Sequence, residues 1–409
     1  MPHITNPSHA SKPMERIGHT FPNELPRAQQ LLAKHCYWDD ESQTLWIDAR
    51  KIFPELGVVE VMGWERMMFD AQPIPNYPSD WAVLLWSNYS QFSNWRKQVP
   101  AWVLDSCALF PTYQLKLLHF CGKYPQLLEL LDHAPLLAWR LVSVDLAEAE
   151  IVALLAGKRI DIVEQVGWPG KESTVKFLRN LRLRWVNQEI TEQIEICLLD
   201  DSRMQALKAL PRINSMALSL AARFPHLIGS PLHRSLAQLP CRPMQCKSMV
   251  ALLEDVYRLG KAQSLAQDEI DRIGKCRYLS DVTEIYETWL SSAIEVALQQ
   301  TVPSVVSLAD RLEQSTAKFE QLISFEEWVQ ISIVQQHAWL IDFIENQQAC
   351  QDGDLKLIAW QDGESIWAAM LELTAESKWE VTRVRGLENA LADAKPWSDL
   401  HLWQATGKL

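Results

Sequence analysis

One histidine and two arginines near the C-terminus are suited to chemistry. His337 lies in an apolar segment that predicts an amphipathic helix, and Arg383 and Arg385 alternate in a segment typical of a strand. Alternate residues of a strand point to the same face, so the two guanidiniums could bind one phosphate bidentately. They could equally pair with Glu372 or Glu380 on a neighbouring strand. His337 is either a hydrogen-bonded core residue or a candidate catalytic proton donor or polar anchor.

The segment 158–184 concentrates positive charge. It holds seven basic residues against three acidic ones, in a chain of net charge −12. The basic residues are Lys158, Arg159, Lys171, Lys176, Arg179, Arg182 and Arg184. The segment resembles a helix-turn-helix in which Ser173 caps the second helix, although its turn, around Pro169, is longer than usual. It predicts either nucleic-acid contact or a solvated basic helix.

Three cysteines and two histidines between residues 226 and 276 are candidate metal ligands. Cys241 and Cys246 lie close together, with His226 and His233 upstream and Cys276 downstream. A structural zinc ion needs four converging ligands, and this spacing matches common zinc motifs poorly. We therefore expect a proline-braced loop here, and neither a metal nor another cofactor. No paired spacing repeats among the eight cysteines, and the N-terminus has no apolar core typical of a secretory signal, which favours reduced thiols in the cytoplasm.

Known catalytic motifs are absent from the sequence. It has no glycine-rich nucleotide loop, no HExxH, no G-x-S-x-G and no nuclease-like cluster of carboxylates. This favours a protein that is not an enzyme, although catalytic residues that converge only in space stay possible.

The periodicity predicts a mainly α-helical protein with a small α+β module at the C-terminus. We expect an irregular lead-in over 1–20, a Trp-rich mixed region over 21–110, a helical domain over 111–300 and the α+β module over 301–409. No apolar run is long enough to span a membrane.

The Trp-rich region predicts specific elements. We expect a helix over 25–38, short strands or buried turns over 44–53 and 57–64, and a helix over 80–98 capped by Asp80. The chain has 18 tryptophans. They are either core residues, which we favour, or an interface for partners or nucleobases.

The C-terminal module predicts one long amphipathic helix followed by a three-stranded antiparallel meander. The helix covers 324–349 and ends at Gly353. Its apolar stripe is Phe325, Val329, Ile333, His337, Ile341 and Ile344. The strands cover 355–360, 365–373 and 379–386, and Asp362-Gly363 predicts a hairpin between the first two. Gly386 is expected to permit a turn that Asn389 caps.

These C-terminal residues resemble the PcfJ-like family, whose members occur in conjugative plasmids, phages and other bacterial mobile elements. The resemblance covers about 325–397. The residues that match the family pattern are His337, Gly353, Gly386 and Asn389, together with the apolar strand Ala369–Leu373. The family's His-Cys pair is His337-Ala338 here, so any chemistry of that cysteine is lost. The resemblance implies a mobile-element or phage-defence context better than it implies a reaction.

Three functions are consistent with these features. The first is a non-catalytic component of a mobile-element or phage-defence system that binds DNA or RNA through 158–184 and through Arg383 and Arg385. The second is an acidic adaptor or inhibitor subunit that binds a protein partner in a larger complex. The third is a nuclease-like enzyme with a site near His337 and Arg385.

Overall fold

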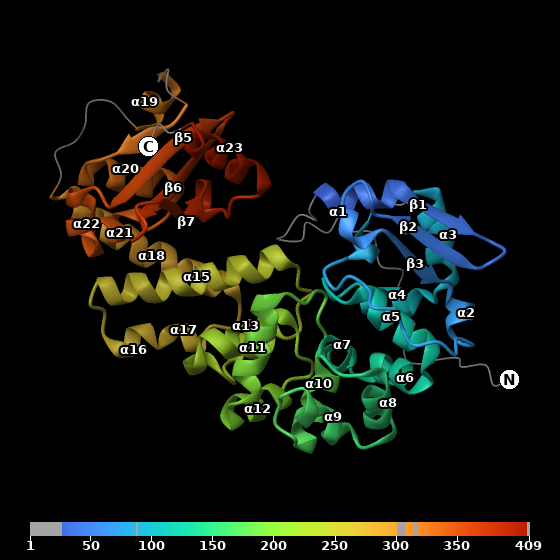
Figure 1. Cartoon of the computed structure of the whole chain (residues 1–409). Helices are drawn as coiled ribbons and strands as arrows, with labels where there is room; N and C mark the ends of the chain where they lie inside the picture. The colour runs from blue at the N-terminus through green and yellow to red at the C-terminus, as the bar shows by residue number, and fades with distance from the viewer. Residues whose placement is uncertain (1–26, 87–88, 301–307, 315–317, 407–409) are drawn as a thin grey trace. The chain divides into compact units, whose positions relative to one another are not determined.

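The computed structural model describes residues 27–86, 89–300, 308–314 and 318–406, so the predicted lead-in over 1–20 lies outside the described residues. The chain forms two compact units, Met1–Leu199 (unit 1) and Asp200–Leu409 (unit 2). The boundary between them falls inside the range 111–300, which we predicted as one helical domain. The protein is mainly helical, as predicted, with one antiparallel sheet in each unit (Figure 1).

The sheet of unit 1 is a three-stranded meander. Its strands are β1 (Cys36–Asp39), β2 (Thr44–Asp48) and β3 (Val58–Met62), in the order β1-β2-β3. The strands predicted within 44–53 and 57–64 are therefore confirmed. The helix predicted over 25–38 is wrong in its second half, because α1 (Arg27–Leu32) and the short 3₁₀ helix η1 (Ala33–His35) lead into β1. Pairing with β2, which places Tyr37 opposite Trp46, overrides the local helical pattern.

The other regular elements in the described part of unit 1 are helices. They are α2 (Trp64–Met67), α3 (Ser90–Gln98), α4 (Ala101–Cys107), α5 (Gln114–Lys123), α6 (Pro125–His133), α7 (Pro135–Ser143), α8 (Glu148–Ala156), α9 (Arg159–Gln165), α10 (Glu172–Asn180) and α11 (Gln188–Leu198), with 3₁₀ helices η2 (Pro54–Leu56) and η3 (Val83–Leu85). Asp80 does not cap a helix, because α3 begins at Ser90. The Gln29 side chain instead donates to the Asp80 carbonyl at 2.9 Å and accepts from the Ala82 amide at 3.2 Å.

Most tryptophans are core residues. Twelve of the 18 are buried. They are Trp38, Trp64, Trp81, Trp86, Trp95, Trp139, Trp168, Trp185, Trp289, Trp328, Trp339 and Trp360. Trp102, in contrast, is 41% exposed. The core interpretation is confirmed for the buried twelve, whose large apolar rings lie in the interior of the protein.

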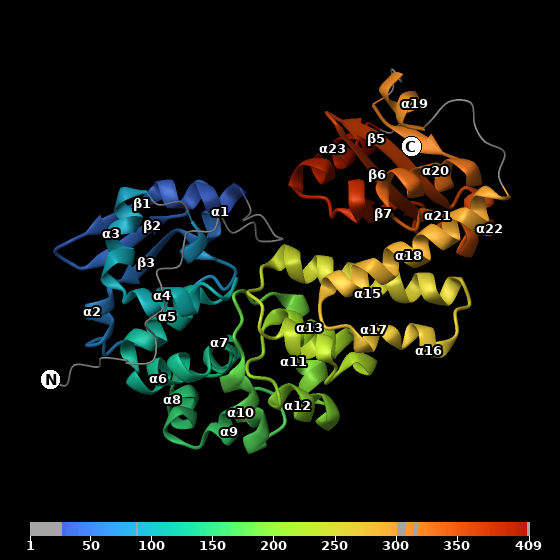
Figure 2. The ribbon, with the colours of Figure 1, turned by 180° about the vertical axis from the view of Figure 1, so that it is seen from behind.

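Unit 2 begins with helices. They are α12 (Asp201–Lys208), α13 (Ser215–Arg223), α14 (Pro231–Leu236), α15 (Pro243–Ala262), α16 (Gln267–Ile270), α17 (Arg272–Lys275), α18 (Leu279–Leu298) and α19 (Leu308–Gln314), with the 3₁₀ helix η4 (Pro225–Leu227). The long helices α15 and α18 lie side by side (Figures 1 and 2). No helix among the described residues of either unit has the length and apolar character needed to cross a membrane.

The C-terminal part of unit 2 contains a four-stranded antiparallel sheet. Its strands are β4 (Glu320–Leu322), β5 (Leu355–Asp362), β6 (Ser365–Leu373) and β7 (Trp379–Arg385), in sequence order. The predicted meander is confirmed as β5 to β7, and so is its first hairpin, where Gly363 adopts a left-handed φ of 61°. β4 was not predicted, because it has only three residues, too few to show a strand periodicity.

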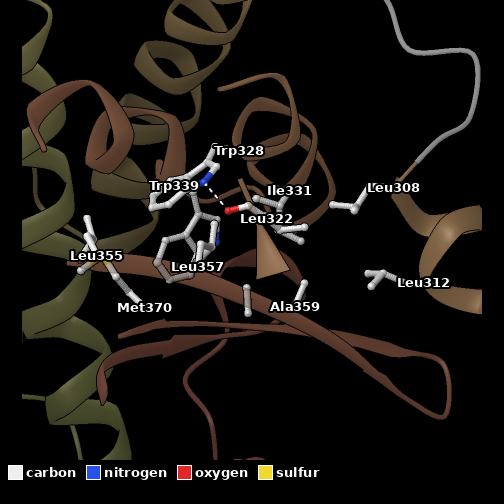
Figure 3. Close-up of a cluster of buried hydrophobic side chains, with 11 residues drawn as sticks. Leu308, Leu312, Leu322, Trp328, Ile331, Trp339, Leu355, Leu357, Ala359 and Met370 are labelled. Atoms are coloured by element: carbon white, nitrogen blue, oxygen red, sulfur yellow. Dashed lines mark hydrogen bonds between the residues drawn. The ribbon is translucent and has the colours of Figure 1, made fainter. Parts of the chain in front are cut away.

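Both faces of this sheet are buried. Leu355, Leu357 and Ala359 of β5 point to one side, where α20 (Phe325–Gln335) and α21 (Trp339–Glu345) supply Trp328 and Trp339 (Figure 3). The alternate residues of β5 and β6 point to the other side, which α23 (Ala394–Gln404) covers. Because side chains alternate along a strand, successive residues of β5 and β6 pack into two separate hydrophobic cores, one on each face of the sheet.

The segment 324–349 is not one helix, and this part of the prediction is wrong. It forms α20 (Phe325–Gln335), α21 (Trp339–Glu345) and the start of α22 (Gln347–Asp352). α20 ends at Gln336, whose φ is 50°. Ile333 and Ile344 are 45% and 54% exposed, so the predicted apolar stripe does not exist. The predicted stop is confirmed, because Gly353 ends α22 with a φ of 80°.

Buried side chains satisfy the backbone at this break. The Ser332 hydroxyl donates to the Trp328 carbonyl at 2.6 Å and accepts from the Leu340 amide at 2.9 Å. The indole N–H of Trp339 donates to Gln335 Oε1 at 2.7 Å. After the break, Trp339 is buried against the sheet, and the burial of its large apolar ring stabilises this course of the chain.

Gly386 is explained by a close contact and not by a turn. Its φ is −114°, which any residue adopts. A Cβ at this position would lie 2.8 Å from Cζ3 of Trp367. The predicted role of Gly386 in permitting a turn is therefore wrong. Asn389, at the end of the 3₁₀ helix η5 (Leu387–Asn389), has the left-handed φ of 57°.

Replacing Gly386 with alanine is expected to lower the free energy of unfolding of unit 2 by about 1–3 kcal/mol, because the Trp367 ring must shift. Chemical denaturation of the full-length protein measures this. The control is Gly274→Ala in α17. A Cβ at position 274 would lie 3.7 Å from the Leu227 side chain, which is an ordinary van der Waals contact. Equal stability of the two variants would contradict the explanation.

Candidate functional site

Two places in the described structure concentrate charged residues, one in each unit. The first is the segment 158–184 of unit 1. It folds into α9 and α10, which pack on each other. Buried apolar residues fix the pair, among them Ile162 and Val163 of α9 and Phe177 of α10. Trp168 is buried in the connection, with the Arg140 guanidinium 5.9 Å from its ring centroid.

The predicted cap of the second helix is wrong. α10 begins at Glu172, and Lys171 occupies the N-cap position without a side-chain cap bond. Ser173 therefore lies inside the first turn. The connection follows the predicted course, with Gly167 at a left-handed φ of 86°. The two short helices do pack together, but the long connection departs from a standard helix-turn-helix.

The cations of the segment 158–184 face outward. Six of its seven basic residues are exposed. They are Lys158, Lys171, Lys176, Arg179, Arg182 and Arg184. Arg159 is half-buried and pairs with Glu129 at 3.2 Å, and Lys176 lies 3.8 Å from Glu172. Arg182 donates to the carbonyls of Arg179 and Leu181 at 2.7 and 2.8 Å, which caps the C-terminus of α10.

The second place is a buried polar cluster in unit 2. Four parts of the chain supply it. Asp255 and Arg258 come from α15, and Tyr286 comes from α18. His337 lies in the break between α20 and α21, and Asp342 lies in α21. Arg383 and Arg385 come from β7, and Asn389 comes from η5. We call these eight residues the buried charge cluster. The break after α20 is what brings His337 into it, because the left-handed Gln336 redirects the chain there.

Asp342 is the centre of one half of the cluster. It is 2% exposed. Arg383 Nη1 donates to Asp342 Oδ1 at 3.0 Å and to Asp342 Oδ2 at 2.8 Å. Arg258 Nη1 also donates to Asp342 Oδ1. Both arginines thus share a single buried carboxylate. Burial opposes the charged form of Arg258, but Asp342 and Asp255 outweigh it and raise the pKa of the Arg258 guanidinium.

Asp255 is the centre of the other half and is 4% exposed. Its carboxylate lies 3.6 Å from Arg258 Nη2 and 3.9 Å from Arg385 Nη2. It accepts one hydrogen bond from Asn389 Nδ2 at 3.3 Å. Burial lowers the pKa of the Arg385 guanidinium, and the neighbouring charges of Arg383 and Arg258 add to this despite the opposing effect of Asp255. Asn389 thus contacts a carboxylate and does not cap a turn.

His337 is fully buried, at 0% exposure. Its Nδ1 lies 3.7 Å from Asp255 Oδ2, and the Asn389 side chain lies close enough to interact with the ring. Its ring contacts that of Trp339, edge to face. Burial lowers the pKa of His337 far below its ordinary value, and Arg385, Arg383 and Arg258 lower it further, although Asn389 acts in the opposite direction. The imidazole is therefore neutral at pH 7.

The structure brings together only part of the predicted site. His337, Arg385 and Asn389 meet in the buried charge cluster, whereas Gly353 caps α22 and contributes no side chain. The expected pairing of Arg383 and Arg385 with Glu372 or Glu380 is wrong, because the carboxylates beside them are Asp342 and Asp255. Their bonding to these carboxylates also limits what either arginine can offer to a nucleic acid.

Asp255, Arg258, Tyr286 and Asp342 were not predicted from the sequence. A signal for two of them was present. Asp255 interrupts the apolar face of α15, and Asp342 interrupts the apolar run of α21. A carboxylate in such a position is costly unless it is paired. Such charges can therefore be recognised in the sequence, although their partners cannot.

The cysteines and histidines considered for zinc do not form such a site. Among the described ranges, no group of three or more histidine, cysteine, aspartate or glutamate residues is placed to hold a metal ion. Cys246 Sγ lies 3.2 Å from the Ser219 hydroxyl, and the His233 ring bonds to the Ala217 carbonyl at 3.0 Å. The expected loop at 241–246 is instead the beginning of α15, with Pro243 in its first turn.

Comparison with protein-family models, curated proteins and solved structures finds no match to this chain. The resemblance of 325–397 to PcfJ-like proteins therefore stays a prediction.

Proposed function

We propose that this protein binds nucleic acid through the segment 158–184. The observation that supports the proposal is the outward orientation of its cations, six of which are exposed on and around two short helices. Exposed lysines and arginines in one segment are the residues that contact a phosphate backbone. An isolated solvated helix would carry interspersed charges of both signs, whereas this segment holds seven basic residues against three acidic ones.

The biological setting of the proposal rests on the resemblance to PcfJ-like proteins. We infer a non-catalytic component of a bacterial mobile-element or phage-defence system. The eight cysteines are free thiols, as the reducing cytoplasm would keep them. The nuclease alternative is less well supported, because His337 has no exposed surface through which to contact a substrate.

The net charge of −12 sets the kind of binding to expect. Phosphates are repelled by most of the molecule and attracted by one segment, so binding is expected to weaken steeply as salt concentration rises. Each phosphate contact contributes about 0.9 to the slope of the logarithm of affinity against the logarithm of salt concentration.

Charge reversal tests the proposal. Arg179→Glu combined with Arg184→Glu is expected to lower the affinity for DNA or RNA at least about tenfold at low salt, and to reduce the salt slope by about 2. Fluorescence anisotropy with labelled oligonucleotides measures both. Arg182 is left unchanged, because its bonds to backbone carbonyls stabilise the end of α10.

A matched control carries the same change in charge elsewhere in unit 1. Lys51→Glu combined with Lys97→Glu alters two exposed lysines, and Lys97 occupies the last turn of α3 as Arg179 does in α10. Affinity lost equally in both variants would indicate a general charge effect, and affinity unchanged in both would remove the proposed interface. A salt-resistant stoichiometric protein complex without nucleic acid would favour the adaptor alternative.

A further inference from the structure

The buried charge cluster has a polar arrangement that the nucleic-acid proposal does not use. Three guanidiniums, those of Arg258, Arg383 and Arg385, are close enough to influence one another. Two buried carboxylates, Asp255 and Asp342, face them. Glu345 adds a third carboxylate near Arg258, but it is exposed and therefore screened by solvent. The interior of the cluster thus holds more positive than negative charge.

Hydrogen bonding is distributed unevenly over the cluster. Asp342 receives all the close guanidinium bonds, whereas Asp255 lies at 3.6 and 3.9 Å from its arginines. Among the described residues, Arg258 Nη2 and Arg385 Nε are buried without a hydrogen-bond partner, although Arg258 Nη2 keeps its ion pair with Asp255 at 3.6 Å. Buried donors without partners are rare in folded proteins and costly. Both donors lack an acceptor within hydrogen-bonding distance.

We propose that the buried charge cluster binds a phosphate-class oxyanion between Arg258 and Arg385. A tetrahedral oxyanion has several acceptor oxygens, which suit Arg258 Nη2 and Arg385 Nε, the two donors without a hydrogen-bond partner. Both side chains retain some contact with solvent, at 20% and 11% exposure, although the two donor atoms themselves are buried. Asp255 competes with the oxyanion for the same two guanidiniums.

This competition predicts effects of opposite sign. Arg385→Gln removes the free Nε donor and one positive charge, and is expected to weaken phosphate binding at least about tenfold. Asp255→Asn keeps the shape of the side chain but removes the competing charge, and is expected to tighten phosphate binding several-fold. A cluster with a purely structural role would lose stability in both variants and would not bind phosphate in either.

Isothermal titration of inorganic phosphate into the full-length protein measures the affinity, and thermal denaturation with and without phosphate gives an independent reading. Arg385→Lys is the second variant, since it keeps the charge without the forked donors and should bind with intermediate affinity. Tightening in Asp255→Asn together with weakening in Arg385→Gln supports the site. Absence of phosphate binding in both the wild type and Asp255→Asn overturns it.

The source of the phosphate is resolved by competition. A 5′-phosphorylated oligonucleotide that displaces inorganic phosphate better than its unphosphorylated twin would identify a nucleic-acid end as the source, and equal displacement would point to free phosphate. The outcome does not depend on the proposed interface in unit 1. Phosphate binding should be unchanged in the Arg179→Glu, Arg184→Glu variant, so the two proposals can fail separately.

Discussion

Replacing Asp342 with asparagine is expected to lower the free energy of unfolding of unit 2 by about 3 kcal/mol. The carboxylate is 2% exposed and is shared by Arg258 and Arg383. Asparagine has nearly the same volume, so the loss comes from removing the counter-charge of Arg383 and leaving Arg258 with only the more distant Asp255. Urea denaturation of the full-length protein measures the loss, and hydrogen exchange in β6 and β7 assigns it to unit 2.

Asp352→Asn is the control for this prediction. Asp352 closes α22, where it accepts exposed hydrogen bonds from Gln348 at 2.9 Å. Its replacement is expected to change stability by less than about 0.5 kcal/mol. If Asp342→Asn changed stability as little as the control, the cluster would not be an important stabilising contact of unit 2.

Replacing Trp95 with alanine is expected to lower the free energy of unfolding of unit 1 by about 3–5 kcal/mol. Trp95 is 0% exposed, stacks on Phe92 with ring centroids 5.6 Å apart, and donates its indole N–H to the Met62 carbonyl at 3.0 Å. Alanine leaves a cavity and an unpaired carbonyl between α3 and β3. Denaturation monitored by circular dichroism gives the change.

Trp102→Ala is the matched comparison, because Trp102 belongs to the same Trp-rich region but is 41% exposed. Its replacement within α4 is expected to cost less than about 1 kcal/mol. Similar losses for both tryptophans would mean that Trp102 also has a structural role. A partner that binds the wild type but not Trp102→Ala would instead identify this tryptophan as part of an interface.

In the buried charge cluster, the orientation of the arginines could be predicted from the local sequence, but their partners could not. Arg383 and Arg385 were correctly expected on one face of a strand, because side chains of a strand alternate with a period of two. Their partners were not foreseen, because Asp255 and Asp342 lie more than 40 residues away in sequence on other helices. Nothing in the spacing of a strand specifies which helix will cover it.

The break between α20 and α21 shows the same limit. Apolar residues at steps of three and four predicted a continuous helix over 324–349, yet Gln336 ends α20 in a left-handed conformation. Helix propensity is a weak preference, so it does not strongly favour a continuous helix over two helices separated by a break. Burial of Trp339 against the sheet, with Ser332 and Gln335 satisfying the freed polar groups, decides between them.

Local patterns alone therefore determined the mainly helical class, the β5–β7 meander with its Asp362-Gly363 hairpin, and the basic character of 158–184. These features depend on residues a few positions apart, whose periodicity and turn chemistry the sequence displays directly. Tertiary structure decided the end of α20, the close approach of Trp367 to Gly386 and the pairing within the buried charge cluster. Those depend on burial and on contacts between distant segments, whose free energies exceed local preferences and appear only when the chain is folded.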